Sequence, residues 1–140
     1  MKWTFDEPRE GDIIRICLGD IYHYGIYVSD DEIIQFGEPP TTILRRDDEV
    51  EVCVTDIEGF LCSKFLEVAQ LDKKEMKKAR KPEEVVAIAR GRIGEKGYSI
   101  LYNNCEHFVN ECVFGEKICS QTDNIRKMWR LKLGTGENND

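Results

Sequence analysis

The chain has 140 residues, of which 41% are hydrophobic and 34% are charged. This length and composition predict one soluble globular domain and exclude a disordered chain. No apolar run approaches the roughly 20 residues that span a bilayer, and the start of the chain lacks the apolar stretch of a signal peptide. We therefore expect a cytoplasmic protein without a transmembrane segment.

The net charge of −7 argues against a nucleic-acid-binding protein, which needs lysine and arginine to displace phosphate counterions. The charge is unevenly spread. The segment from Lys73 to Lys81 holds six basic residues and one acidic residue, a net +5, so the rest of the chain carries −12. This basic segment could make a peripheral contact with an anionic membrane surface. The alternative is an ordinary solvated helix face.

Six cysteines are present, at positions 17, 53, 62, 105, 112 and 119. Without a signal peptide, and with enough apolar residues for a core, we expect their thiols to be reduced. There is no CxxC pair, and the only histidines are His23 and His107. The sequence therefore predicts no structural zinc site and no other cofactor.

The first half of the chain is rich in β-branched and aromatic residues, which favour strands. We expect strands at 12–18, 23–28, 32–36 and 50–54, with a turn at 29–31. The segment 37–40 should end the third strand, because proline is poorly tolerated inside a sheet.

The second half of the chain predicts helices. Pro82 and the two glutamates after it suit a helix start, and Gly94 can end that helix. Its expected buried positions, at helical spacing, are Val85, Val86, Ala89 and Ile93. A last helix is expected from about Thr122. Strands grouped first and helices later indicate an α+β fold, with an antiparallel sheet packed against helices.

Another predicted helix carries Cys105, the cysteine that stands out among the six. Asn104 is a good N-cap, Gly115 fits just past the helix end, and Cys105 falls in the first turn. The positive end of the helix dipole favours a thiolate there, and backbone N–H groups at that end could bind the oxyanion of a tetrahedral intermediate. The ordinary alternative is a core cysteine, because Cys105 shares an apolar stripe with Phe108, Val109 and Cys112.

A cysteine nucleophile needs a general base, and two histidines are available. His107 lies two residues after Cys105, and side chains at that spacing on a helix do not face each other. His23, on the second expected strand, is free to meet Cys105 across the fold. We therefore predict that His23 is the base and that His107 is a structural hydrogen-bonding residue.

A base histidine usually needs a third polar group to orient its ring, and Gln35 on the next strand is the candidate. His23 and Gln35 share a face of the sheet only if Gly25 pairs with Gln35, which requires an odd-length loop or a bulge near 29–31. A plain two-residue turn would put the two side chains on opposite faces.

The segment 104–109, Asn-Cys-Glu-His-Phe-Val, resembles the NCEHF signature of the lecithin:retinol acyltransferase (LRAT) family. Residues 11–14 resemble the opening GDLI-type strand of that family, and residues 23–28 resemble its HWAIYV-type strand. The family belongs to the permuted branch of the NlpC/P60 papain-like superfamily. The resemblance thus implies a single LRAT-like domain over 8–132 with a circularly permuted papain-like fold. It leaves 133–140 as a disordered tail.

This resemblance implies acyl chemistry through a thioester, on a phospholipid or another acyl ester, with Cys105 as the nucleophile and His23 as the base. It also implies that no cofactor is needed. The family often has a second histidine twelve residues after the first, and here that residue is Gln35. A glutamine can orient His23 through a hydrogen bond, but it cannot titrate near neutral pH.

Three further residues are expected at or beside the site. Tyr24 stands where many family members carry tryptophan, and it is a candidate substrate-binding residue. Asn104 and His107 are expected to have structural roles. Several animal members have a C-terminal membrane anchor that this sequence lacks, so it would meet lipid peripherally.

Two other functions compete with the acyltransferase interpretation. Permuted papain-like isopeptidases also place histidine before cysteine, so a soluble cysteine peptidase or amidase is the first alternative. The segment 106–108 (Glu-His-Phe) favours the LRAT family over it, whereas the missing anchor and Gln35 favour it slightly. The second alternative is a non-enzymatic binding module that retains the fold, which only Gln35 supports.

Overall fold

The computed structural model describes residues 1–39, 47–99 and 104–116. In this part of the chain six strands form one sheet, in the order β1-β6-β2-β3-β4-β5, and every neighbouring pair is antiparallel. The strands are β1 (Lys2–Thr4), β2 (Ile13–Leu18), β3 (Ile21–Ser29), β4 (Glu32–Phe36), β5 (Val52–Thr55) and β6 (Glu67–Gln70). The helices are α1 (Ile57–Leu61), α2 (Lys73–Lys78), α3 (Pro82–Gly91) and α4 (Cys105–Phe114), and a 3-10 turn covers Asp47–Glu49. The predicted α+β class is confirmed.

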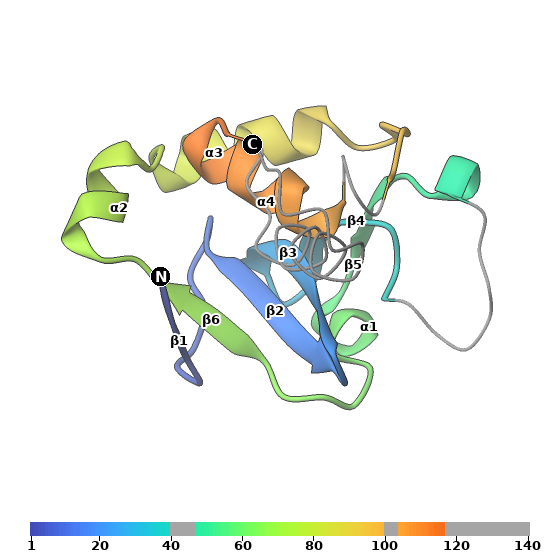
Figure 1. The fold of residues 1–140 in the computed structure, drawn as a ribbon, viewed down its shortest axis with the longest axis horizontal. Coiled ribbons are helices and arrows are strands. Elements are labelled where there is room, and N and C mark those ends of the chain that lie inside the picture. Colours follow the sequence, from blue (N-terminus) through green and yellow to red (C-terminus); the bar gives the residue numbers. More distant parts are fainter. Residues whose placement is uncertain (40–46, 100–103, 117–140) are drawn as a thin grey trace, which may run out of the picture.

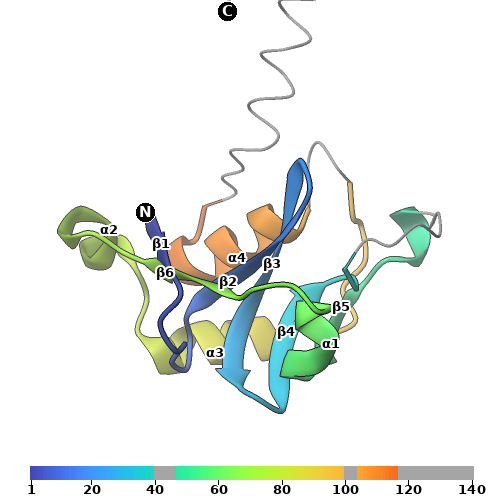
Figure 2. The same cartoon turned by 90° about the horizontal axis from the view of Figure 1, so that it is seen from below.

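The sheet has an apolar core on each of its faces. Figure 1 shows α3 and α4 together above the sheet, and their side chains pack with Tyr24, Ile26 and Phe36. On the other face, Phe60 of α1 packs with Ile14, among others. Seen from below in Figure 2, α1 lies in front of β4 and β5, and α4 lies behind β2 and β3. Because both faces are covered, β3 and β4 are buried at consecutive positions instead of alternating with solvent.

The register between β3 and β4 is the one that puts His23 and Gln35 on the same face of the sheet. Gly25 lies opposite Gln35, and the register shifts between Tyr27 and Ser29. The shift is a β-bulge, which adds one residue to β3 and restores the pairing. It lies just before the turn at which the sequence required an irregularity, so the predicted condition is met.

Two elements correct the expected order of strands and helices. β6 follows α1, so the strands are not all grouped before the helices. β1 pairs with β6, so the sheet includes residues before the boundary that was predicted at residue 8. Neither strand was predicted from the sequence. Each is short, and β1 is stabilised by a partner more than 60 positions away in the chain, which local propensity cannot reveal.

The helix that starts at Pro82 is shorter than predicted. It ends at Gly91 instead of Gly94, and Ile93 is 46% exposed instead of buried. The other three predicted core positions of that helix, Val85, Val86 and Ala89, are buried as expected. The chain turns after Gly91 so that the N–H of Gly94 can bond to the carbonyl of Val52 in β5.

β5 begins two residues later and ends one residue later than predicted. α1 and α2 were not predicted as helices. The cysteines that the structure describes are in no disulfide; they are Cys17, Cys53, Cys62, Cys105 and Cys112. Among the described residues, no helix is long and apolar enough to cross a bilayer. The helix expected from Thr122 and the tail at 133–140 lie outside the described residues.

Candidate active site

The N-terminus of α4 is fixed by a complete set of capping bonds. The Oδ1 atom of Asn104 accepts hydrogen bonds from the backbone N–H groups of Glu106, at 3.0 Å, and of His107, at 3.1 Å. In return, the Nδ1 atom of His107 accepts a hydrogen bond from the N–H of Asn104, at 3.1 Å. Such reciprocal capping holds the first turn rigidly, and Cys105 is the first residue of that turn.

This capping arrangement gives His107 a specific state. Its Nδ1 atom accepts a hydrogen bond, so that nitrogen carries no proton and the ring is neutral. The ring lies at the helix N-terminus, where a positive charge would be unfavourable. His107 is therefore part of the helix cap.

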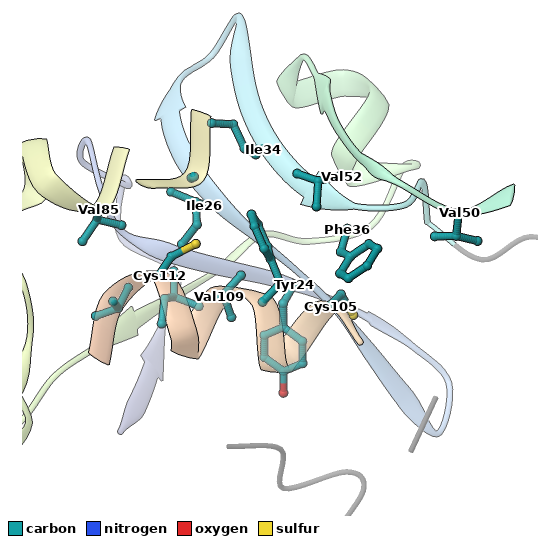
Figure 3. Close-up of a cluster of buried hydrophobic side chains, with 14 residues drawn as sticks. Tyr24, Ile26, Ile34, Phe36, Val50, Val52, Val85, Cys105, Val109 and Cys112 are labelled. Carbon is teal, nitrogen blue, oxygen red and sulfur yellow. The ribbon is translucent and has the colours of Figure 1, made fainter. Parts of the chain in front are cut away.

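α4 places Cys105 in the core between two strands. The helix packs on β3 and β4, and Cys105 belongs to the same buried cluster as Tyr24 and Phe36. Figure 3 shows both aromatic side chains beside the first turns of α4, with Cys105 at the end of the helix. Tyr24 is the residue next to His23 in β3, and successive side chains of a strand point to opposite faces of the sheet. Tyr24 therefore packs with Cys105 on the α4 face, whereas the ring of His23 packs with Phe60 of α1.

α4 is more deeply buried than its predicted apolar stripe. The four stripe positions are buried, but so are Glu106, His107, Asn110 and Val113. Periodicity could not show this, because three of these residues are polar. The C-terminal end of α4 is held by Arg80, whose Nη1 atom donates to the carbonyl oxygens of Glu111, at 2.7 Å, and of Cys112, at 2.9 Å.

His23 and Gln35 form a buried hydrogen-bonded pair. The Nε2 atom of His23 lies 2.9 Å from the Oε1 atom of Gln35, and the two side chains are 2% and 1% exposed. The ring of His23 also packs against Phe60, with 5.2 Å between the ring centroids. A glutamine oxygen only accepts, so this contact puts a proton on Nε2 of His23 and leaves Nδ1 as the basic nitrogen.

The far end of the Gln35 side chain has a partner that the sequence did not indicate. Its Nε2 atom donates to the sulfur of Cys53, at 3.7 Å. Cys53 lies on β5 directly opposite Gln35. Burial raises the pKa of the Cys53 thiol, and the hydrogen bond from Gln35 offsets part of this rise. The thiol is therefore neutral at neutral pH, and its sulfur faces the amide nitrogen of Gln35.

Tyr24 lies among charged groups, Glu106 and Arg15. Burial raises the pKa of the Tyr24 hydroxyl, and the nearby carboxylate of Glu106 raises it further. The guanidinium of Arg15 acts in the opposite direction. The Arg15 group is stacked between Trp3 and Tyr22, at 3.9 and 3.8 Å from their ring centroids. The Tyr24 hydroxyl therefore stays protonated and can act as a hydrogen-bond donor.

The basic segment from Lys73 to Lys81 lies away from this site. Arg80 contacts the last turn of α4, whereas Cys105 begins the first turn. A ten-residue helix is about 14 Å long, so the length of α4 separates them. The lysines of α2 are exposed, and α2 lies at the far left in Figure 1.

The site offers acid–base and nucleophilic groups and no set of metal ligands. Within 1–39, 47–99 and 104–116, no group of three or more histidine, cysteine or carboxylate side chains could hold a metal ion.

The family model of lecithin retinol acyltransferase matches residues 6–118, which is most of the chain.

The chain belongs to the lecithin retinol acyltransferase family.

Curated members of this family are similar to most of the chain. Lecithin retinol acyltransferase from Homo sapiens is 30% identical over 136 residues, covering 82% of this chain and 58% of that protein. Phospholipase A and acyltransferase 4 from Homo sapiens is 27% identical over 138 residues, covering 90% of this chain and 82% of that protein. Phospholipase A and acyltransferase 3 from Mus musculus is 29% identical over 118 residues, covering 78% and 72%.

The chain matches only part of the length of each lecithin retinol acyltransferase. The chain spans about 60% of the length of those from Homo sapiens, Bos taurus and Rattus norvegicus.

Three residues that contact the predicted site residues or their surroundings were not indicated by the sequence. Cys53, Arg15 and Phe60 each contact a predicted site residue or its immediate surroundings. Their positions depend on the β4–β5 and β2–β3 registers and on the place of α1. The sequence carries no local signal for these long-range pairings.

Proposed function

We propose that this chain is a thiol-dependent acyltransferase or hydrolase that forms a thioester between Cys105 and the acyl group of a phospholipid or another acyl ester. In this proposal His23 is the general base and Gln35 orients its ring. The observation that carries the proposal is the buried hydrogen bond between Nε2 of His23 and Oε1 of Gln35. Polar side chains this deeply buried need hydrogen-bond partners, and this pairing also gives His23 the orienting partner that a general base requires.

The first step is removal of the thiol proton of Cys105. The oxygen of Gln35 keeps a proton on Nε2 of His23, so Nδ1 takes the proton from Cys105. The register pairs Gly25 with Gln35, which puts His23 opposite Gly37, beyond the end of β4. The proposal brings the start of α4 to the ring of His23 past this end of β4.

The second step is acyl transfer. The thiolate of Cys105 attacks the carbonyl carbon of the ester, and a tetrahedral intermediate forms. The leaving alcohol takes the proton back from His23, and the acyl group stays on the sulfur as a thioester. Attack by an alcohol, an amine or water then releases it, with His23 again taking and returning a proton.

The capping bonds limit which N–H groups can bind the oxyanion. Asn104 already uses the N–H groups of Glu106 and His107, so the proposed donor is the N–H of Cys105 itself. The Tyr24 hydroxyl is the proposed contact to the substrate, because Tyr24 is in the same cluster as Cys105. Asn104 and His107 keep structural roles, and no cofactor is needed.

Lipid would be met peripherally in this proposal, from the cytoplasm. The basic segment from Lys73 to Lys81 is the candidate for contact with an anionic surface, and its place at the other end of α4 separates this role from the chemistry. An acyl lipid is the proposed substrate because four of the matched relatives are named phospholipase A and acyltransferase.

Mass spectrometry of the intact protein tests this function. The wild type is incubated with a short-chain phosphatidylcholine, beside Cys105→Ala and Cys112→Ala. Cys112 is a matched control because it is a buried cysteine of the same helix. We expect a mass gain of one acyl chain in the wild type and in Cys112→Ala, and none in Cys105→Ala.

Other outcomes of this experiment have clear meanings. Fatty acid release without an adduct, abolished in Cys105→Ala, indicates a thioester that water removes quickly. Neither adduct nor release, in a folded protein, contradicts a phospholipid substrate, and peptide and amide substrates would then be tested. Equal release by wild type and Cys105→Ala would overturn the proposed role of Cys105.

A further inference from the structure

Gln35 differs from a histidine in one respect that matters for His23. The two ends of its amide have nearly the same shape, but one end accepts hydrogen bonds and the other donates them. With the oxygen toward His23, the proton sits on Nε2 and Nδ1 is basic. With the nitrogen toward His23, Nε2 would have to accept, the proton would move to Nδ1, and the base would be unable to take a proton from Cys105.

The amide orientation must therefore be fixed by whatever lies beyond Gln35. In the structure that neighbour is Cys53, whose sulfur is 3.7 Å from the Nε2 atom of Gln35. The two residues are directly paired across β4 and β5, so their side chains leave the sheet on the same face. Gln35 is almost completely buried, so its nitrogen cannot turn to bulk water instead.

The sulfur of Cys53 is in a suitable state to accept. Its surroundings keep the thiol neutral, because burial raises its pKa. The contact with the Gln35 amide acts against this rise, as it does when a sulfur accepts a hydrogen bond. This direction favours the sulfur lone pairs over the S–H bond as the contact with Gln35.

We propose that Cys53 is a positioning residue, whose sulfur holds the amide nitrogen of Gln35 and thereby turns the amide oxygen toward His23. This inference rests on the proposed function, in which His23 must present an unprotonated Nδ1 atom to Cys105. It adds a third member to the hydrogen-bonded row of β3, β4 and β5, which runs from His23 through Gln35 to Cys53.

The test reads the tautomer of His23 directly. Long-range ¹H–¹⁵N NMR of the ring nitrogens distinguishes a proton on Nε2 from a proton on Nδ1, in the resting protein and without substrate. The variants are Cys53→Val, which removes the acceptor at similar size, and Cys53→Ser, which keeps one. Cys17→Val is the matched control, because Cys17 is an exposed strand cysteine whose thiol bonds to the carbonyl of Gly19.

We expect the Nε2–H tautomer in the wild type, in Cys53→Ser and in Cys17→Val. Cys53→Val should show a loss of that tautomer, with kcat about two- to fivefold lower and KM unchanged, as for one weak hydrogen bond. In a Gln35→Ala background, which has no amide to orient, Cys53→Val should have no further effect on kcat. Cys53→Ala replaces Cys53→Val if the latter does not fold.

Three results would overturn the inference. They are an Nδ1–H tautomer in the wild type, an unchanged tautomer in Cys53→Val, and a Cys53→Ser variant that behaves like Cys53→Val. The NMR result does not depend on turnover. If no acyl-enzyme forms but the tautomers behave as expected, the positioning role stands and the proposed substrate fails.

Discussion

Gly25 and Gln35 lie directly opposite each other in the β3–β4 pair, and this single pairing brings Gln35 to the ring of His23. The bulge between Tyr27 and Ser29 is what makes the pairing possible. Without the extra residue every side chain of β4 would move to the other face of the sheet, and Gln35 would leave the site.

Gln35 can be tested by substitution. If it orients His23, Gln35→Ala should lower kcat for acyl transfer at least about tenfold, because the base loses its fixed ring orientation. Gln35→His should preserve or raise kcat, since an imidazole can make the same contact. Steady-state kinetics with circular dichroism as a check on folding would measure both. Equal activity in all three proteins would remove Gln35 from the site.

Two substitutions of the cap residue Asn104 distinguish the effect of losing the capping hydrogen bonds from the effect of adding a charge. Asn104→Ala removes the oxygen that accepts from Glu106 and His107, and should lower the free energy of unfolding by about 1 kcal/mol in a urea titration. Asn104→Asp keeps an accepting oxygen, so its stability should stay within about 0.5 kcal/mol of the wild type.

The new charge in Asn104→Asp should act on the neighbouring thiol. A carboxylate beside Cys105 disfavours the thiolate, so alkylation of Cys105 by iodoacetamide should slow about three- to tenfold at neutral pH. Peptide mass spectrometry gives the rate at this cysteine. A rate equal to that of the wild type would mean that the thiolate does not form beside the cap.

The two cysteines of α4 should differ strongly in reactivity. Burial raises the pKa of the Cys112 thiol to about 12, so hardly any thiolate exists there at pH 8. Cys105, at the positive end of the helix dipole, should react with iodoacetamide at least about a hundredfold faster than Cys112. If Cys105 reacts no faster than the other cysteines, it is not an activated nucleophile.

Cys112 also predicts how stability depends on alkaline pH. The thiol ionises near pH 9 when the chain is unfolded, but only near pH 12 when it is folded. Between these values the unfolded state binds fewer protons than the folded state, so the free energy of unfolding falls as pH rises, by up to about 1.4 kcal/mol per pH unit for this group. Above pH 9, Cys112→Ala should show a shallower fall than the wild type in chemical denaturation. Parallel slopes would contradict the buried thiol.

Gly25 should tolerate no side chain. A Cβ atom there would lie 2.7 Å from Cε1 of Phe60 and 3.1 Å from Cγ2 of Ile33, inside a packed core. Gly25→Ala should therefore cost about 1–3 kcal/mol of unfolding free energy and displace the Phe60 ring that packs on His23. Gly91→Ala is the matched control, because its Cβ would meet no atom within 4 Å. Equal stability of the two variants would show that Phe60 is not tightly packed there.

Local sequence signals predicted α4 most accurately. An asparagine N-cap, an apolar stripe and a glycine in the left-handed conformation, with φ of 76° at Gly115, bounded the helix at both ends. These features act within a few residues of each other, so the sequence states them directly. The same local rules placed α3 correctly at its start but not at its end, because the bond from Gly94 to Val52 in β5 draws the chain out of the helix.

The sequence by itself determined the chemistry that the site can offer. The motif around Cys105, the two histidines and Gln35 are visible in it, and so is the family, because residue identities carry this information. Which of these residues meet was decided by the tertiary structure. The bulge in β3 and the pairings of β4 with β5 and of β1 with β6 join residues that are distant in the chain. Such pairings are stabilised by the burial of both sheet faces together. The free energy of that burial comes from residues far apart in the chain, so no local stretch of sequence predicts it.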